Sequence, residues 1–243
     1  MTIKALIGVR SGSQRVKNKN IRPFADSSLL EIKIKQLQQV PELNGVVVNS
    51  NSDEMLEIAC RLGAETVKRD EYFASSEVSP NEYYENIAQN CDADIIVSTV
   101  CTVPLAGSEV YSRAIRRFFD MPEKYDSLIT VSPLKEFLWV DGKALNYDVK
   151  RKPRSQDLPE NFVILNHAIH ILSRETMITS KDNIGETPYL YPITPVESID
   201  IDTPLDFEFA EFMYNKQNVI RTVDNKLLYF CFPSWKDQPS YAA

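Results

Sequence analysis

Hydrophobic residues follow two different patterns along this chain, and the two patterns alternate. Continuous apolar runs, which predict buried strands, cover residues 3–9, 46–48, 94–100 and 128–131, with a shorter run at 65–67. Apolar residues spaced three or four positions apart, which predict helices, lie between these runs at residues 29–37, 55–62, 80–87 and 108–119. The alternation predicts an α/β fold: a mainly parallel sheet with helices on both faces.

Residues that favour helix ends support these boundaries. Ser28 and Ser52 stand directly before two of the predicted helices and can cap them, and Pro80 fits the first turn of the next. The last predicted helix begins at Thr203-Pro204. Its apolar stripe is predicted to consist of Leu205, Phe209, Phe212 and Met213.

The pattern changes between about residues 132 and 173. Asp141-Gly142 predicts the turn of a hairpin, a basic cluster follows at residues 150–154, and residues 162–172 alternate loosely like a strand. We interpret residues 132–173 as a small arm inserted in a domain that spans residues 1–217 and expect the arm to serve dimerisation. Residues 218–243 are expected to form a C-terminal tail.

Composition narrows the class of protein. With 43% hydrophobic and 25% charged residues, the 243-residue chain has an ordinary soluble globular composition, and its net charge of −7 argues against broad nucleic-acid binding. It has no apolar run of the roughly 20 residues that a membrane span needs and no secretory signal pattern. Its four cysteines are widely spaced, which favours reduced thiols over a zinc site. We therefore expect a cytoplasmic protein that binds neither membrane nor nucleic acid.

The first candidate for chemistry is the stretch from Arg10 to Arg22, directly after the first predicted strand. It holds five cations and no acid, although the rest of the chain carries a net charge of −12. Gly12 allows close approach of the backbone to a ligand, so the stretch predicts a phosphate site. A solvated basic turn is the alternative. The glycine spacing matches neither a Walker A loop nor a dinucleotide fingerprint.

The second candidate is the pair Asp200 and Asp202. In an extended strand these carboxylates would share one face, and hard oxygen ligands of this kind suit Mg²⁺. The alternative is helix capping, because Thr203 and Asp206 have the spacing of a capping box and Asp202 could itself be a cap. Cations and a metal pair in one domain would together suit chemistry at a nucleoside triphosphate.

These stretches carry a family resemblance. The segment V-R-S-G-S-Q-R-V-K-N-K-N resembles the first motif of the CMP-sugar synthetases, the acylneuraminate cytidylyltransferase family, commonly A-R-x-G-S-K-x-x-x-x-K-N. The segment S-I-D-I-D-T-P-L-D is similar to the metal motif that closes the family pattern. K-P-R-S-Q-D-L-P and N-H-A-I-H-I resemble the family's P-R-x-Q-x-L-P and N-G-A-I-Y-I segments. The matches run in order from residue 5 to about 212.

The resemblance implies a nucleotide-diphospho-sugar transferase-like fold, usually a homodimer. It also implies that an acidic sugar, sialic acid-like or another nonulosonic acid, attacks the α-phosphorus of CTP to give a CMP conjugate and pyrophosphate. Mg²⁺ would be bound by Asp200 and Asp202. The residues implied to hold CTP are Arg10, Gly12, Ser13, Arg15, Lys19, Asn20, Arg69 and Ser79. Those implied in catalysis are Arg10, Arg15, Lys19 and Asp202, and those near the acceptor are Thr102, Arg154, Gln156, Asn166 and His167.

The chain departs from the family pattern at a few positions. Gln14 replaces the Lys of G-S-K, and Asn51 replaces the Asp of V-S-T-D. Val100 replaces the Gln of L-Q-P-T-S-P-L, and His167 replaces the Gly of N-G-A. Because most departures fall where the acceptor would sit, two alternatives stay open: transfer of CMP to another acceptor, such as Kdo or a phosphonate, and a noncatalytic nucleotide-binding relative.

Overall fold

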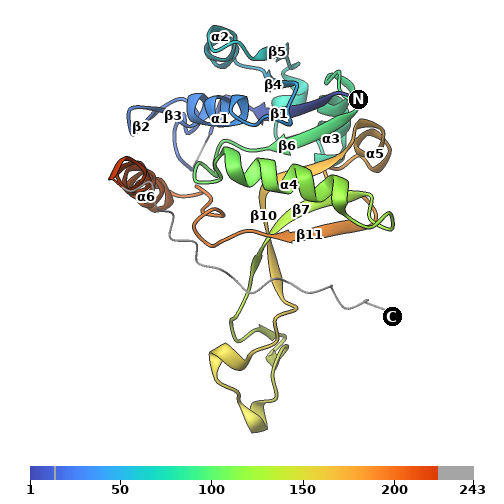
Figure 1. The fold of residues 1–243 in the computed structure, drawn as a ribbon, viewed down its shortest axis with the longest axis vertical. Helices are drawn as coiled ribbons and strands as arrows, with labels where there is room; N and C mark the ends of the chain where they lie inside the picture. Colours follow the sequence, from blue (N-terminus) through green and yellow to red (C-terminus); the bar gives the residue numbers. More distant parts are fainter. Residues whose placement is uncertain (14, 224–243) are drawn as a thin grey trace.

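A seven-stranded sheet forms the centre of the computed structural model, which describes residues 1–13 and 15–223 (Figure 1). The strands run in the order β11-β7-β10-β6-β1-β4-β5 across the sheet. Their bounds are β1 Ile3–Val9, β4 Gly45–Ser50, β5 Glu65–Lys68, β6 Ile95–Thr99, β7 Ser127–Pro133, β10 Val163–Ser173 and β11 Pro188–Pro192.

Most neighbouring strands are parallel, as predicted. β1 pairs in parallel with β4 and β6, β4 with β5, and β7 with β11. β10 is the exception, because it is antiparallel to both β6 and β7. Its register against β7 shifts between Leu165 and His170, so the strand carries a bulge there. The carboxyl ends of β1, β4 and β6 therefore share one edge of the sheet, where ligands bind in such folds.

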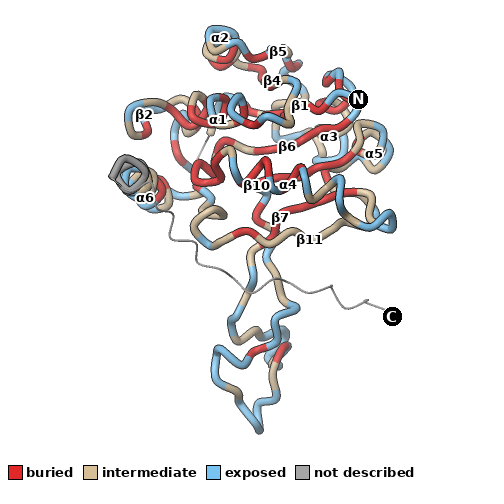
Figure 2. Tube along the Cα trace, viewed as in Figure 1, coloured by how far each residue is buried: buried red, intermediate tan, exposed pale blue. Residues whose placement is uncertain are grey.

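Helices cover both faces of the sheet, as predicted. Alternate side chains of β1 lie on opposite faces of the sheet. Ala5 and Ile7 pack in one hydrophobic cluster, and Leu6 packs in the other. The first cluster includes residues from α1 Leu29–Gln38, α2 Asp53–Arg61, α4 Ser108–Asp120 and α6 Pro204–Val223. The second includes residues from α3 Pro80–Gln89 and α5 Arg174–Ser180. Figure 2 shows the central strands as the most deeply buried part of the trace.

The helix starts follow from the predicted caps. Ser28 Oγ accepts a hydrogen bond from the backbone N–H of Glu31 at 3.3 Å, and Ser52 Oγ accepts one from that of Met55 at 3.4 Å. Pro80 is the first residue of α3, and Ser79 and Glu82 form a capping box at the start of this helix. Local sequence thus determines where these helices begin.

The predicted arm is too long at its C-terminal end. The hairpin within it is confirmed: β8 Trp139–Val140 pairs with β9 Lys143–Ala144 through a turn with positive φ at Asp141 and Gly142. Residues 163–173, however, form β10, which lies between β7 and β6 inside the main sheet. The reason is the buried end of β10, where Ala168, Ile169, Ile171 and Leu172 belong to the core. The arm is therefore residues 134–162, the part that projects from the sheet in Figure 1.

The predicted apolar stripe of α6 is wrong. Leu205, Phe209 and Phe212 are exposed by 73%, 51% and 55%. The buried face instead carries Phe207, whose ring meets that of Phe24 edge-on with 5.2 Å between centroids. The helix has aromatic residues on more than one face, and the long-range contact with Phe24, in the short pair β2 Pro23–Phe24 and β3 Ser27–Ser28, selects the inward one.

The sequence patterns did not predict β11 or α5. Short 3₁₀ turns also form at Tyr72–Ala74, Val149–Arg151 and Ser155–Asp157. Residues 224–243, most of the expected tail, lie outside the described residues. Within the described part, no helix is both long enough and apolar enough to cross a membrane.

Candidate active site

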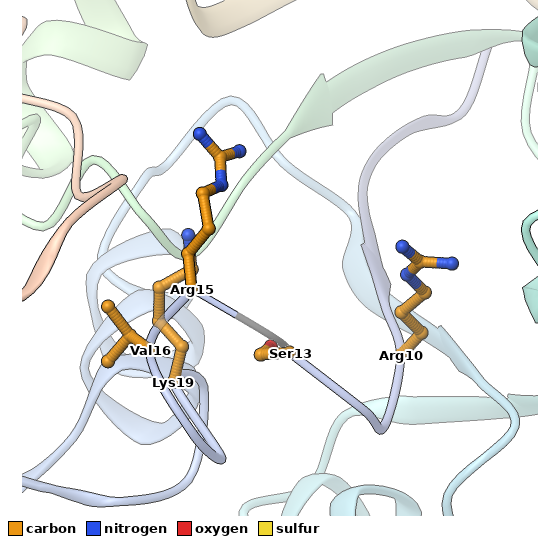
Figure 3. Close-up of a pocket in the computed structure, with 5 residues that line it drawn as sticks. All are labelled: Arg10, Ser13, Arg15, Val16 and Lys19. Carbon is orange, nitrogen blue, oxygen red and sulfur yellow. The ribbon is translucent and has the colours of Figure 1, made fainter.

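The basic loop after β1 surrounds a cavity at the carboxyl edge of the sheet. The cavity measures about 320 Å³ and is lined by Arg10, Ser13, Arg15, Val16 and Lys19. Figure 3 shows Arg10 on one side and Arg15 and Lys19 on the other, with Ser13 between them. Gly12 has a φ of +80°, which glycine adopts without strain. Gln14 lies outside the described residues.

Backbone hydrogen bonds hold the second half of this loop. The N–H groups of Ile21 and Arg22 both donate to the carbonyl of Asn18, at 3.0 and 2.9 Å. The carbonyl of Asn20 accepts from the N–H of Leu30 at 2.9 Å, which ties the loop to the start of α1. Asn20 is buried and does not line the cavity. The structure thus places Asn20 in the support of the loop.

Asp202 lies directly against the basic loop. Its carboxylate is 2.9 Å from Arg15 Nη2 and 3.9 Å from Lys19 Nζ, and Lys19 Nζ also donates to the carbonyl of Ile201 at 2.5 Å. The expectation of an extended strand here is wrong, because residues 200–202 form a loop before α6. Contacts made over 180 residues of sequence bring the two motifs together, rather than strand geometry.

Asp200 is held by the loop that follows β6. The carbonyl of Thr102 accepts from the N–H of Ile201 at 2.9 Å, and the nearby Thr102 side chain acts to lower the pKa of the Asp200 carboxyl. Although the residue as a whole is exposed, loss of water around its carboxyl raises the pKa of Asp200, and Asp202 adds to this. Burial likewise lowers the pKa of Lys19, against the attraction of both carboxylates. Desolvated groups of opposite charge thus face each other at this edge.

The capping box predicted for Thr203 and Asp206 is also confirmed, whereas Asp202 is not itself the cap. The N–H of Asp206 donates to Thr203 Oγ1 at 3.2 Å, and Asp206 Oδ2 accepts from the N–H of Thr203 at 2.7 Å. These hydrogen bonds lower the pKa of Asp206. Because Thr203 and Asp206 cap α6, the carboxylate of Asp202 stays directed at the cations.

A second cavity, of about 450 Å³, adjoins the first through Arg10, which lines both. It also contains Arg69 and Ser79, two residues predicted from the sequence. Arg10 Nη1 donates to the carbonyl of Ala74 at 2.8 Å, which fixes the guanidinium at the junction. The rest of the lining is Gly8, Val9, Phe73, Ser75, Ser76, Val78, Pro80, Tyr83 and Tyr84.

Arg69 is the most unusual residue of the second cavity. It is only 2% exposed, it donates through Nη2 to the carbonyl of Val9, and it stacks over the ring of Tyr83 at 5.1 Å. Its Nε and Nη1 atoms have no hydrogen-bond partner within the described residues. Gly8 must lack a side chain here, because a Cβ would lie 2.0 Å from Tyr83 Oη. A buried cation with free donors is suited to a polar ligand.

The bulge in β10 contributes two more predicted residues. Asn166 Oδ1 accepts from Thr130 Oγ1 at 2.7 Å, and its amide donates to Ser132 Oγ at 3.1 Å. His167 is exposed, has a φ of +53°, and stacks on His170 with 5.5 Å between ring centroids. The backbone conformation at 167 is one that glycine prefers, which is the residue found there in the resembled motif.

Arg154 and Gln156 are not brought to either cavity. Both lie on the arm, where Arg154 Nε forms an ion pair with Asp157 at 2.7 Å and the Gln156 carbonyl accepts from Lys135 Nζ at 3.4 Å. Asn51, a departure from the family pattern, instead supports the basic loop. Its side chain accepts from the N–H of Ser11 at 3.1 Å and donates to Glu71 Oε2 at 2.9 Å.

Sequence reasoning did not identify Tyr83 or Phe73 as lining residues. A usable signal was present for Tyr83, which lies one turn into a helix that begins directly after a polar stretch. Among residues 1–13 and 15–223, no cluster of three or more His, Cys, Asp or Glu side chains is arranged to hold a metal ion. Two carboxylates are nevertheless enough for Mg²⁺ when substrate phosphates complete its coordination.

Comparison with known proteins identifies the family to which the sequence is similar. Residues 4–224 match the family model described as cytidylyltransferase. The chain is 25% identical over 235 residues to post-translational flagellin modification protein B of Campylobacter coli, covering 89% of this chain and 97% of that protein. It is 26% identical over 226 residues to pseudaminic acid cytidylyltransferase of Campylobacter jejuni, covering 86% and 94%.

A solved structure shares the fold. The structure of CMP:2-keto-3-deoxy-manno-octonic acid synthetase complexed with CTP superposes with a TM-score of 0.65 at 12% identity. The superposition covers 89% of this chain and 100% of that one. The sheet and the helices on its two faces therefore share the fold of that structure.

Proposed function

Because the chain belongs to the cytidylyltransferase family, we propose that it transfers CMP from CTP to a hydroxyl of an acidic sugar and releases pyrophosphate. The family makes it a CTP-dependent nucleotidyltransferase. One observation carries the finer proposal: Arg10 joins a cation-lined cavity to a cavity with a buried arginine, and Asp202 faces the cations. Triphosphate and nucleoside would fill the two cavities side by side.

The triphosphate would lie among Arg10, Arg15 and Lys19. Guanidinium and ammonium groups bind phosphate oxygens through charge-assisted hydrogen bonds. Since Arg10 lines both cavities, the phosphate nearest the nucleoside would lie beside it. That phosphate is the α-phosphate, where the acceptor attacks and negative charge develops. Arg10 is therefore placed to stabilise the transition state directly.

The nucleoside would lie in the second cavity. The free donors of Arg69 could bind carbonyl or ring acceptors of cytosine, and Ser79 lines the same space. The ring of Tyr83 stacks against the Arg69 guanidinium and helps to hold it in place. A base that presents a donor where cytosine presents an acceptor would leave these groups unpaired, which gives a physical basis for preferring CTP.

We propose that Asp200 and Asp202 hold Mg²⁺ together with the triphosphate. Their hard oxygen atoms and their position beside the phosphate cavity fit this ion. When bound, Mg²⁺ would neutralise phosphate charge and polarise phosphoryl oxygens. In the structure Arg15 balances the charge of Asp202. Arg15 would then exchange this ion pair for contacts with the phosphates when the carboxylate takes up the metal.

The acceptor would bind beside the ends of β6 and β10, where Thr102, Asn166 and His167 lie. Thr102 contacts Asp200, and the bulge brings His167 to the same edge of the sheet. A relative named for pseudaminic acid supports an acidic sugar as the acceptor class. At position 167 the backbone has a conformation that glycine prefers, but this chain has a histidine side chain where the resembled motif has glycine. That difference favours an acceptor other than sialic acid itself within the same class.

Changing His167 to Gly tests this assignment. The variant is expected to keep or raise the melting temperature, because glycine relieves a left-handed backbone that costs a non-glycine residue about 1 kcal/mol. The KM for the acceptor should rise about tenfold, the effect of one lost hydrogen bond. The KM for CTP should not change. Steady-state kinetics with both substrates gives these values, and an unchanged acceptor KM would remove His167 from the acceptor site.

We also propose that two copies pair through the arm and that the enzyme acts in the cytoplasm. The arm exposes large apolar side chains, each at least half accessible: Trp139, Val140, Leu145 and Val149. Pairing would shield this surface from water. Cys60, Cys91 and Cys101 are free thiols, which a reducing compartment maintains. Sedimentation at the mass of one chain at micromolar concentration would contradict the pairing.

A pyrophosphate-release screen tests the proposed function. The purified chain is incubated with Mg²⁺, each of CTP, UTP, ATP and GTP, and a panel of acceptors that includes pseudaminic acid, N-acetylneuraminic acid, Kdo and a phosphonate. Release is expected with CTP and at least one acidic sugar. Release with the phosphonate alone would instead establish the alternative acceptor. Binding of CTP without release for any acceptor would establish a noncatalytic relative, and equal use of all four nucleotides would exclude the cytidylyl assignment.

A further inference from the structure

Lys33 is a fully buried lysine in the middle of α1, and its burial lowers the pKa of the side chain to about 7. It has no exposed surface, and within the described residues its ammonium makes no ion pair with a carboxylate. Its Nζ instead donates to three oxygens: the carbonyl of Val103 at 2.9 Å, the carbonyl of Ala106 at 3.2 Å and Tyr111 Oη at 2.8 Å. Burial of an ammonium group is unfavourable, and an apolar side chain would suit a helix core better. A buried lysine in a helix core is therefore expected to have a role other than stabilising the core.

Two of these three oxygens belong to one loop. Val103 and Ala106 lie in residues 100–106, which form all but the last residue of the connection between β6 and α4. Gln36, one turn later on α1, donates through Nε2 to the carbonyl of Pro104 at 2.7 Å. The backbone of the loop is thus fixed from beneath by two side chains of α1, with the ammonium at the centre.

The third oxygen extends the network to the β10 bulge. Tyr111 Oη is 2.6 Å from Thr99 Oγ1, and Thr99 Oγ1 donates to the carbonyl of Ala168 at 2.8 Å. Ala168 directly follows His167. One chain of buried hydrogen bonds therefore runs from Lys33 to both segments that border the acceptor region.

The loop in turn holds a proposed metal ligand. The carbonyl of Thr102 accepts from the N–H of Ile201, the residue directly after Asp200, at 2.9 Å, and the Thr102 side chain lies near the Asp200 carboxyl. In the resembled motif this loop reads L-Q-P-T-S-P-L, whereas Val100, Cys101 and Val103 stand here in place of Gln, Pro and Ser. The chain thus lacks the polar side chains and one of the prolines that would stiffen such a loop from within.

We propose that Lys33 is a positioning residue: its ammonium holds loop 100–106 so that Thr102 orients Asp200 toward the metal and triphosphate. Neither Lys33 nor its three oxygen partners line the cavities assigned to CTP. Lys33 therefore acts through Thr102 and Asp200 without touching nucleotide. The inference rests on the proposed function for its kinetic consequence, but the effect on the loop itself is independent of turnover.

The first experiment compares Lys33→Met with Lys35→Met. Met has a similar length without the charge, and Lys35 is an exposed cation on the same helix. For Lys33→Met, kcat is expected to fall about tenfold or more and the Mg²⁺ concentration for half-maximal rate to rise about tenfold, the usual effect of losing a group that orients a metal ligand. The KM for CTP should stay within about twofold of wild type. Lys35→Met should match wild type in all three values.

The second measurement is amide hydrogen exchange of residues 100–106 and 201. Exchange is expected to accelerate in Lys33→Met and not in Lys35→Met, because local opening of the loop becomes easier. Since this readout needs no acceptor, it decides the inference even if the screen finds no turnover. If Lys33→Met does not fold, Tyr111→Phe keeps the ring and removes one link, and faster exchange in the loop is again expected. Unchanged exchange, or a fall in kcat with an unchanged Mg²⁺ requirement, would overturn the proposal.

Discussion

Replacement of Asp202 by Asn is expected to lower Mg²⁺-dependent kcat/KM by about 10²–10³-fold while the fold stays intact. The change removes one negative charge from the proposed metal site, and a metal contribution of several kcal/mol corresponds to a factor of this size. The fold should tolerate the change, because the ion pair between Asp202 and Arg15 is roughly half exposed and contributes at most about 1 kcal/mol. Initial rates over a Mg²⁺ titration, together with thermal melting, give both quantities.

Asp206→Asn is the matched control. Asp206 lies four residues further along and caps α6 with Thr203. Its replacement is expected to cost about 1 kcal/mol of stability through the weakened cap while turnover stays near wild type. The two variants therefore separate the metal hypothesis from the capping hypothesis. Equal turnover in Asp202→Asn and wild type would leave Asp202 without a metal role.

Replacement of Arg10 by Met is expected to produce the other large loss, about 10²–10³-fold in kcat/KM. Arg10 is the residue shared by the two cavities, so its guanidinium would contact the phosphate that is attacked. Loss of one charged donor to a transition state typically has an effect of this size. The fall should appear mainly in kcat, with a smaller rise in the KM for CTP, because charge at the α-phosphate grows during the reaction.

Lys17→Met controls for charge in the same loop. Lys17 is exposed and lines neither cavity, so removal of its charge changes the local electrostatics without removing a phosphate contact. Its kcat/KM should stay within about threefold of wild type at moderate salt, where exposed charges are screened. Similar losses in Arg10→Met and Lys17→Met would mean that the loop attracts CTP through its overall charge alone.

Local signals predicted the parts of the fold that local forces determine. The strand β1, the helices α1 to α4 and their caps follow from apolar periodicity and from Ser28, Ser52 and Pro80. The predictions fail where the local sequence favours two arrangements equally and contacts with residues distant in the sequence select one of them. The apolar residues of α6 allow more than one buried face, and contact with Phe24 selects the one that carries Phe207.

The site shows the same division. The charge pattern identified the stretch from Arg10 to Arg22 and the pair Asp200 and Asp202, and the family resemblance implied roles for Arg10, Arg15, Lys19 and Asp202. The structure places these four residues together at one cavity edge. The role of Lys33 could not be predicted, because an amphipathic helix pattern does not reveal which polar residue is buried. Only the approach of loop 100–106 to α1 gives its ammonium the carbonyl partners that it needs.

The most direct test of the central claim is the identity of the reaction product. The chain, Mg²⁺ and CTP are incubated with the acidic sugar that gives the most pyrophosphate, and the mixture is analysed by phosphorus NMR and mass spectrometry. The account predicts a single phosphodiester that joins cytidine to the acid through one phosphorus, with one pyrophosphate formed for each molecule of conjugate. A product in which the acid carries a phosphate without cytidine, or a cytidine diphosphate conjugate, would contradict attack at the α-phosphorus.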